Sequence, residues 1–262
     1  ADDADQVLWN AAIHYESARF IMRAVRVRRV LLERFPDSNL AKRALYLIGA
    51  NYHALAIYGE AADYYEQFAR RFPGEFGEDC TDADRSANTC AIAPQALENA
   101  IFFRLGLGEE ERAVADIELY ERSYRRRMPR ETANVRFSLG SLYERQGAWQ
   151  RVYDHYSSFL RNYGRQAPVH QVIRANVQVG RAVWEVQERQ RDRAQPFFQT
   201  AVRTWERGGL EALNRAMPEG ERERASFEAR ESVSEALFYL GEYQFNAFRN
   251  VRFPRFSGSR NL

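Results

Sequence analysis

Two cysteines are the residues of this sequence with the clearest chemistry. Cys80 and Cys90 share the segment GEFGEDCTDADRSANTCAIAP, which is polar, rich in glycine and without a helical pattern. A buried structural thiol is expected on an apolar helix face, so two thiols on one loop predict a disulfide. Closing so short a loop stabilises a fold by roughly 2–3 kcal/mol, by the chain-entropy argument. A disulfide favours an oxidising compartment.

The same segment has the acidic alternation of a calcium loop in Asp82-x-Asp84-x-Ser86. A calcium loop also needs a glycine after the third ligand and a bidentate acid at its end. Neither is present here. We therefore expect a solvated, disulfide-closed loop with no metal or other cofactor.

The motifs of common catalytic sites are absent from the sequence. There is no G-x-S-x-G, no G-x-x-x-x-G-K and no H-E-x-x-H. The histidines form no ligand motif with a cysteine or an acid; they are His14, His53, His155 and His170. A site assembled from distant residues stays open, but we expect a protein that is not an enzyme.

The elements that must hold these residues are paired helices. One face of a first helix is defined by apolar or small residues at i, i+3, i+4 and i+7, namely Leu45, Ile48, Gly49 and Tyr52. A break is expected at Gly59, because glycine tolerates positive φ. An apolar stripe then resumes with Ala61, Tyr65 and Phe68, and Pro73 ends this second helix.

Small residues at Gly49 and Ala61 would let the two helices approach, and the aromatic residues would fill the space between them. This arrangement resembles the tetratricopeptide repeat (TPR). The phrase FPDSNLAKRALYLIGANY is similar to TPR proteins of the bacterial envelope, of the barrel-assembly lipoprotein and Tol-associated division-coordination type. Because four other segments repeat the spacing, we expect an all-α, right-handed solenoid of about five hairpins plus a long C-terminal helix.

We expect one solenoid domain over residues 1–262. Its hairpins are predicted at 4–36, 39–73, 94–129, 131–164 and 168–206, followed by a helix at 209–216 and a long helix at 221–249. The long helix resembles a first helix with no second helix after it. It lacks the polar cap of a finished solenoid, so the sequence suggests a fragment of a longer chain.

Charge and hydropathy limit the classes of partner that we expect this protein to bind. The 262 residues carry 38 basic and 36 acidic side chains, and no apolar run reaches the ~18 residues needed to span a bilayer. We expect neither nucleic-acid binding nor a membrane span. Arginines crowd the end of one predicted helix from Arg122 to Arg130. Cations there are favoured by the helix dipole, and an anionic partner surface is the alternative.

The resemblance implies a groove, lined by the first helices, that binds an extended segment or a helix of a protein partner. The residues opposite the packing stripe are Trp9, Asn10, Arg43, Tyr46, His53, Phe102, Asn134, Phe137, Glu144, Arg174, Gln178, Arg181 and Trp184. The alternative is that the aromatic members pack between adjacent first helices. The family's clamp for a terminal carboxylate is not matched, because Lys42 is the only lysine.

These observations predict a non-enzymatic protein–protein interaction scaffold in a bacterial cell-envelope complex, in the periplasm. The alternatives are a cytosolic TPR adaptor with reduced cysteines and a recognition module for a small ligand or glycan. The groove hypothesis predicts which side chains are solvent-accessible, namely Tyr46, Phe137, Arg181 and Trp184. It predicts that the packing stripe is buried at Ile48, Tyr52, Leu139 and Tyr143.

Overall fold

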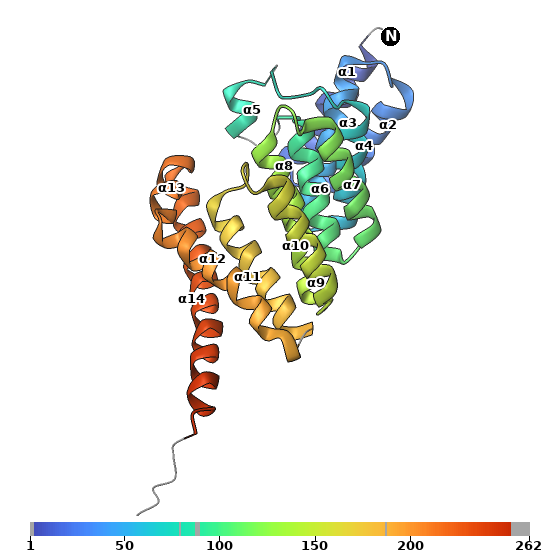
Figure 1. The fold of residues 1–262 in the computed structure, drawn as a ribbon. Coiled ribbons are helices and arrows are strands. Elements are labelled where there is room, and N and C mark those ends of the chain that lie inside the picture. Colours follow the sequence, from blue (N-terminus) through green and yellow to red (C-terminus); the bar gives the residue numbers. More distant parts are fainter. Residues whose placement is uncertain (1–2, 79, 87–89, 187, 253–262) are drawn as a thin grey trace, which may run out of the picture. The chain divides into compact units, whose positions relative to one another are not determined.

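The computed structural model of the chain describes residues 3–78, 80–86, 90–186 and 188–252 (Figure 1). The fold is all-α and TPR-like, as predicted. The helices group into two compact units, Ala1–Leu142 and Tyr143–Leu262. A single solenoid over residues 1–262 stays a prediction.

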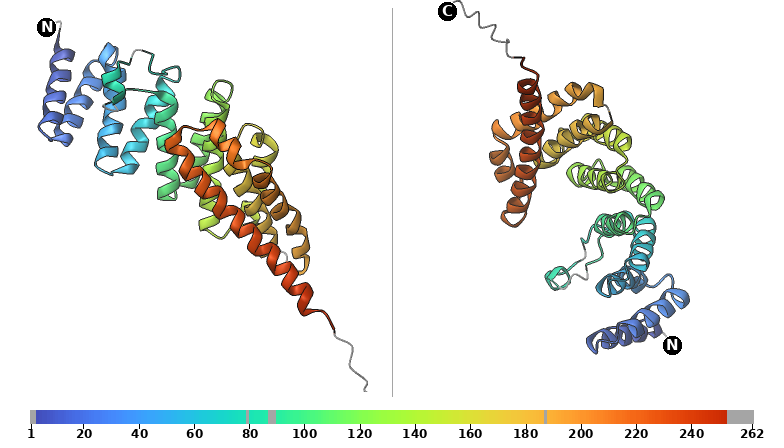
Figure 2. Two further views of the ribbon diagram at one scale, coloured as in Figure 1. Left: turned by 90° about the vertical axis from the view of Figure 1, so that its left-hand side faces the viewer. Right: turned by 90° about the horizontal axis from the view of Figure 1, so that it is seen from below.

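The first unit consists of antiparallel helix pairs that follow one another along the chain (Figure 2). Helix α1 packs against α2, α3 against α4, and α6 against α7, and successive pairs meet through α2 with α3 and α4 with α6. The bounds are α1 Ala4–Ser17, α2 Ile21–Arg34, α3 Asn39–Ala54, α4 Tyr58–Arg71, α5 Asp82–Ser86, α6 Ala93–Leu107, α7 Glu110–Tyr124 and α8 Pro129–Ser138. Helix α9, Gly140–Arg145, crosses the boundary between the units.

The second unit is built around α11, which contacts α10, α12, α13 and α14. Helix α14 also packs along α12 and thereby closes one side of this unit. The bounds are α10 Trp149–Tyr163, α11 Val169–Val186, the 3₁₀ helix η1 Glu188–Ala194, α12 Gln195–Glu206, α13 Gly209–Ala216 and α14 Glu219–Arg249.

Two glycines, one in each unit, lie at close contacts between helices. A Cβ atom on Gly49 of α3 would lie 2.8 Å from Cδ1 of Tyr65 on α4. On Gly180 of α11 it would lie 2.7 Å from Cε1 of Phe198 on α12. Both rings are almost completely buried. The sequence prediction that Gly49 lies at a close helix–helix contact is confirmed.

The turns within the first four hairpins share one hydrogen-bonded geometry. In the second hairpin, the amide of Ala56 donates to the carbonyl of His53 and the amide of Ile57 to that of Tyr52, both at 2.9 Å. This is a Schellman motif, whose key residue has positive φ. The four key residues are Arg19 (φ 64°), Ala56 (58°), Gly108 (77°) and Gly147 (63°).

The expectation of a break at Gly59 is therefore wrong. Gly59 lies inside α4, and Ala56 takes the left-handed conformation instead. The reason is that two backbone hydrogen bonds close the end of α3 at Ala56, which takes a positive φ although it is not a glycine.

Buried arginines connect the hairpins of the first unit. Arg28 of α2 has no solvent exposure and donates to both carboxylate oxygens of Glu16 at 2.6 Å and to Oδ1 of Asn51 at 2.8 Å. These partners lie on α1 and α3. A guanidinium buried in this way is stable only with its carboxylate in place, so the network specifies which helices meet.

Arg104 of α6 has the same role further along this unit. Its Nε donates to Glu66 of α4 at 2.6 Å, and it also pairs with Asp63 and Glu109. Asp116 of α7 lies buried beside Glu66, and burial together with that second carboxylate raises the pKa of Asp116 to about 7.

The glycine contact predicts a selective cost of adding a side chain. Gly49→Leu should lower the free energy of unfolding by about 1–3 kcal/mol, because the new atoms overlap the Tyr65 ring. The matched control is Gly106→Leu in α6, where a Cβ meets nothing within 4 Å. This control should be neutral or slightly stabilising. Equal urea midpoints for the two variants would contradict the assignment.

The raised pKa of Asp116 predicts a pH-dependent stability. Between about pH 4 and 7 the folded protein holds a proton on Asp116 that the unfolded chain releases, so this group's contribution falls as pH rises. The free energy of unfolding, measured with urea, should therefore fall from about pH 4 to 7 in the wild type relative to Asp116→Asn. The wild type should compare best with the variant at about pH 4. A difference that is constant with pH would show that Asp116 ionises normally.

Candidate functional site

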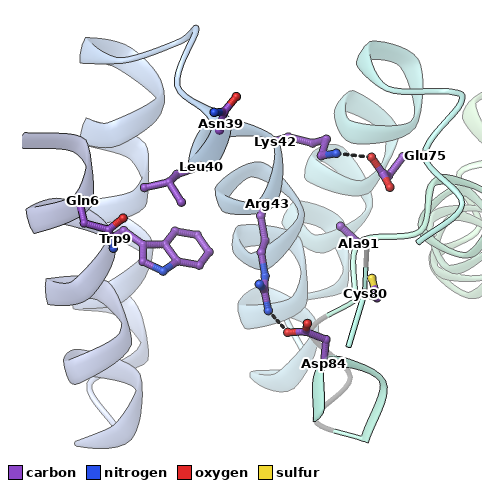
Figure 3. Close-up of a pocket in the computed structure, with 10 residues that line it drawn as sticks. All are labelled: Gln6, Trp9, Asn39, Leu40, Lys42, Arg43, Glu75, Cys80, Asp84 and Ala91. Carbon is purple, nitrogen blue, oxygen red and sulfur yellow. Dashed lines mark hydrogen bonds and ion pairs between the residues drawn. The ribbon is translucent and has the colours of Figure 1, made fainter. Parts of the chain in front are cut away.

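The candidate site is a pocket in the first unit, between the N-terminal parts of α1 and α3 and the loop of residues 74–92, here called the cysteine loop (Figure 3). Its volume is 330 Å³. Its walls are Gln6, Trp9, Asn39, Leu40, Lys42, Arg43, Glu75, Cys80, Asp84 and Ala91. Ion pairs, an indole and two amides therefore share one cavity.

The start of α3 is joined to the start of α1 by a capping residue. Ser38 caps α3, and its Oγ accepts from the amide of Leu40 at 3.1 Å. The same hydroxyl donates to Oδ2 of Asp5 at 2.6 Å. This hydrogen bond is the main cause of a lowered pKa for Asp5. The contact places Gln6 and Asn39 on the same pocket.

The third wall is the cysteine loop, which contains the predicted disulfide. Cys80 and Cys90 are joined with an S–S distance of 2.07 Å. Gly77 has φ 73°, and a Cβ atom there would lie 2.7 Å from Sγ of Cys90. The base of the loop is held by a bridge between Phe76 and Ile92 and by the amide of Ala93, which donates to the carbonyl of Glu75 at 2.8 Å.

Each cation of the pocket is paired with an acid of the cysteine loop. Arg43 pairs with Asp84 and Lys42 with Glu75 (Figure 3). Hydrogen bonds from the hydroxyl and amide of Thr81, and then the charge of Arg43, lower the pKa of Asp84 to about 2. These two ion pairs hold the loop over α3, and the disulfide closes the loop on itself.

Of the acids that resembled a calcium loop, Asp84 takes part in hydrogen bonds and an ion pair within the fold. Asp84 accepts hydrogen bonds from Thr81 and pairs with Arg43. Across residues 3–78, 80–86, 90–186 and 188–252, no group of three or more His, Cys, Asp or Glu side chains is arranged to hold a metal.

The first unit brings some of the predicted groove residues together and separates others. Trp9 and Arg43 line the pocket, where the Arg43 guanidinium lies 5.7 Å from the Trp9 ring centre. Asn10 is exposed and accepts from Gln6. Phe102 is exposed on α6 and does not line this pocket.

Tyr46 is only 2% exposed, so the prediction that it is solvent-accessible is wrong. Its ring packs against Tyr65 and Phe68 of α4, with centres 5.6 and 5.4 Å apart. His53 is half-buried against Phe103 at 4.7 Å, and this burial lowers its pKa. These two residues act in packing.

Asn134 and Phe137 lie half-buried on α8. Phe137 is therefore less accessible than predicted. The residues predicted to be buried are indeed so, at Ile48, Tyr52, Leu139 and Tyr143.

In the second unit α14 packs on two of the predicted groove residues, Trp184 and Arg181. Trp184 is 9% exposed, and its ring lies 5.1 Å from Tyr239 and 5.2 Å from Tyr243 of α14. Arg181 reaches Glu235 of α14 at 3.4 Å. The prediction that Trp184 is exposed is wrong, and the alternative of packing between first helices is correct for this residue.

Two of the remaining groove residues of this unit, Arg174 and Glu144, pair with each other. Arg174 donates to Oε2 of Glu144 at 3.0 Å, and the hydroxyl of Tyr156 donates to the same carboxylate. Gln178 is 3% exposed. Sequence reasoning missed this closure because α14 lies far along the chain from α11.

The arginine cluster is partly engaged within the fold. Arg127 lies 3.7 Å from the ring centre of Phe76 and pairs with Glu78 at 3.5 Å, which adds a contact to the cysteine loop. Arg122 pairs with Glu118 one helical turn earlier. An anionic partner surface here stays a prediction.

Sequence reasoning also missed part of the pocket wall, namely Asn39, Leu40, Lys42, Glu75, Asp84 and Ala91. The available signal was the position of the acidic loop directly after the hairpin that carries Lys42 and Arg43. Among the described residues, no helix is both long enough and apolar enough to cross a membrane.

The paired helices define an all-α, TPR-like fold. Residues 43–74, which cover most of α3 and all of α4, match the tetratricopeptide repeat family. This match supports a TPR protein. The comparison with curated protein sequences found no match.

Solved structures with a similar helical arrangement have low sequence identity. The MamA protein is 14% identical over 79% of this chain and 95% of that chain, with a TM-score of 0.47. YrrB, described as a TPR protein with an unusual peptide-binding site, is 16% identical over 78% and 89%, with a TM-score of 0.43. BtubC from P. vanneervenii is 14% identical over 93% and 95%, with a TM-score of 0.40.

The disulfide predicts a stability cost on reduction. Replacing both Cys80 and Cys90 by Ser should lower the free energy of unfolding by about 2–3 kcal/mol, because the unfolded chain regains loop entropy. The wild type measured in reductant should match the double variant in urea unfolding, and the double variant should not respond to reductant. A urea midpoint of the wild type that does not change with reductant would contradict a stabilising role of the disulfide.

Proposed function

We propose that this chain is a non-enzymatic protein–protein interaction scaffold that binds an extended segment of a partner protein. The observation that carries the proposal is the pocket that joins Trp9 and Arg43, two predicted groove residues, with the cysteine loop. The TPR match over residues 43–74 includes Arg43 and supports the same function class.

The chemistry of the pocket suits a short stretch of peptide. Its 330 Å³ is at the small end of ligand sites, which fits one or two side chains rather than a large cofactor. The amides of Gln6 and Asn39 can donate to and accept from peptide backbone. Arg43 offers a guanidinium that an acidic partner side chain can share with Asp84.

A small ligand or glycan is the alternative occupant. Stacking of a sugar requires an open aromatic face, and Trp9 is only 9% exposed. The burial of this indole beneath Arg43 favours a peptide over a glycan.

We place the scaffold in an oxidising compartment, in a periplasmic or other cell-envelope complex, and the alternative is a cytosolic adaptor. The support is the Cys80–Cys90 disulfide, since intracellular thiols are normally kept reduced. Thiol labelling of the protein in its native cells separates the two locations. Labelling of both cysteines without reductant would place it in the cytosol.

The binding proposal is tested with peptides selected from a displayed random library. Gln6→Arg should weaken the selected peptides at least about tenfold, because the longer charged side chain enters the pocket. The matched control is Gln67→Arg, another exposed helical glutamine that does not line the pocket. Titration calorimetry should find no change for the control. Selection of no binding peptide, or equal loss in both variants, would contradict the proposed site.

A further inference from the structure

The last turns of α14 carry exposed aromatic rings that no helix of the same unit covers. Phe238, Phe245 and Phe248 are 65%, 55% and 66% exposed. Every residue from Gln244 to Arg252 is exposed, and these turns extend past α11 and α12 (Figures 1 and 2). Such a helix gains no packing energy of its own, so a contiguous apolar stripe on it indicates an interaction surface.

The exposed residues follow the spacing of a coiled-coil seam. Steps of four, three, four and three residues connect Ser234, Phe238, Gly241, Phe245 and Phe248. The opposite side of α14 holds Tyr239 and Tyr243, which pack on Trp184 of α11. The seam therefore lies on the side of α14 that faces away from α11.

Gly241 is an unfilled position within this seam. At Gly49 and Gly180, an aromatic ring of a neighbouring helix occupies the space where a Cβ would stand. A Cβ on Gly241 would meet nothing within 4 Å. A glycine inside a helix costs about 1 kcal/mol relative to alanine, a cost that a ring packed over it would offset. The seam thus has open space at Gly241 that a ring of another helix can fill.

We propose that this seam, here defined as residues 234–252 of α14 and its end, pairs antiparallel with the same seam of a second copy of the chain. With the pairing centred near Tyr243, Phe245 of each copy covers Gly241 of the other. Phe238 then meets Phe248 of the second copy. Large residues face small or aromatic ones in each layer, which is the requirement for close helix packing.

The charges along the seam favour a second copy in this orientation. Acidic residues flank its first half, at Glu235 and Glu242, and basic residues flank its end, at Arg249 and Arg252. An antiparallel pair brings the basic end of each copy beside the acidic half of the other. A parallel pair would place like charges together.

Sedimentation velocity over a broad concentration range tests the pairing. The wild type should form a dimer, and Phe245→Glu should weaken it at least about tenfold. The matched control is Phe227→Glu on the same helix, where the side chain is 69% exposed but lies outside the paired region. It should dimerise as the wild type does. A wild type that stays monomeric, or a dimer that survives Phe245→Glu, overturns the proposal in favour of another occupant.

Cross-linking tests the orientation without a charged substitution. Copies with Leu237→Cys, mixed with copies with Val251→Cys, should form a mixed disulfide, because antiparallel pairing brings these flanking positions together. Copies with Phe227→Cys, mixed with the same Val251→Cys copies, should not. Cross-linking of the two mixtures to the same extent overturns the antiparallel register.

Discussion

The contact between a ring on one helix and a bare backbone on the next is the constraint on which this structure depends. Tyr65 over Gly49 and Phe198 over Gly180 occur in separate units but have the same geometry. A side chain on either glycine would push the helices apart and expose the ring. Because each hairpin is only two helices thick, it has no second layer that could compensate for this loss.

Buried charge adds specificity to this packing. Arg28 and Arg104 are almost completely buried, and the charge of each is paired with acids on neighbouring helices. An apolar contact would tolerate a shifted neighbour, whereas an unpaired buried guanidinium would not. Asp116 adds a proton-dependent member to the second network, since its burial and then the neighbouring carboxylate of Glu66 raise its pKa and keep it protonated at mildly acidic pH. The order of the hairpins in the first unit thus depends on electrostatics as well as on shape.

The two units use their first helices differently. In the first unit the cysteine loop folds over the start of α3 and leaves a pocket beside Trp9 and Arg43. In the second unit α14 covers Trp184 and Arg181, so the chain itself fills the equivalent surface. The side of α14 that faces away from this contact then carries the exposed seam. A repeat scaffold can present different surfaces when different segments cover its ends.

The sequence by itself determined the all-α fold, the close contact at Gly49 and the Cys80–Cys90 disulfide. These features follow from local periodicity, from the size of single residues and from two thiols on one short loop. Each of these signals is local in the sequence. Only the tertiary structure decided that Tyr46 and Trp184 are buried and that the pocket has a wall of loop acids. A helical period fixes on which side of its own axis a residue lies. It does not say which distant segment covers that side, because such contacts depend on the three-dimensional path of the chain.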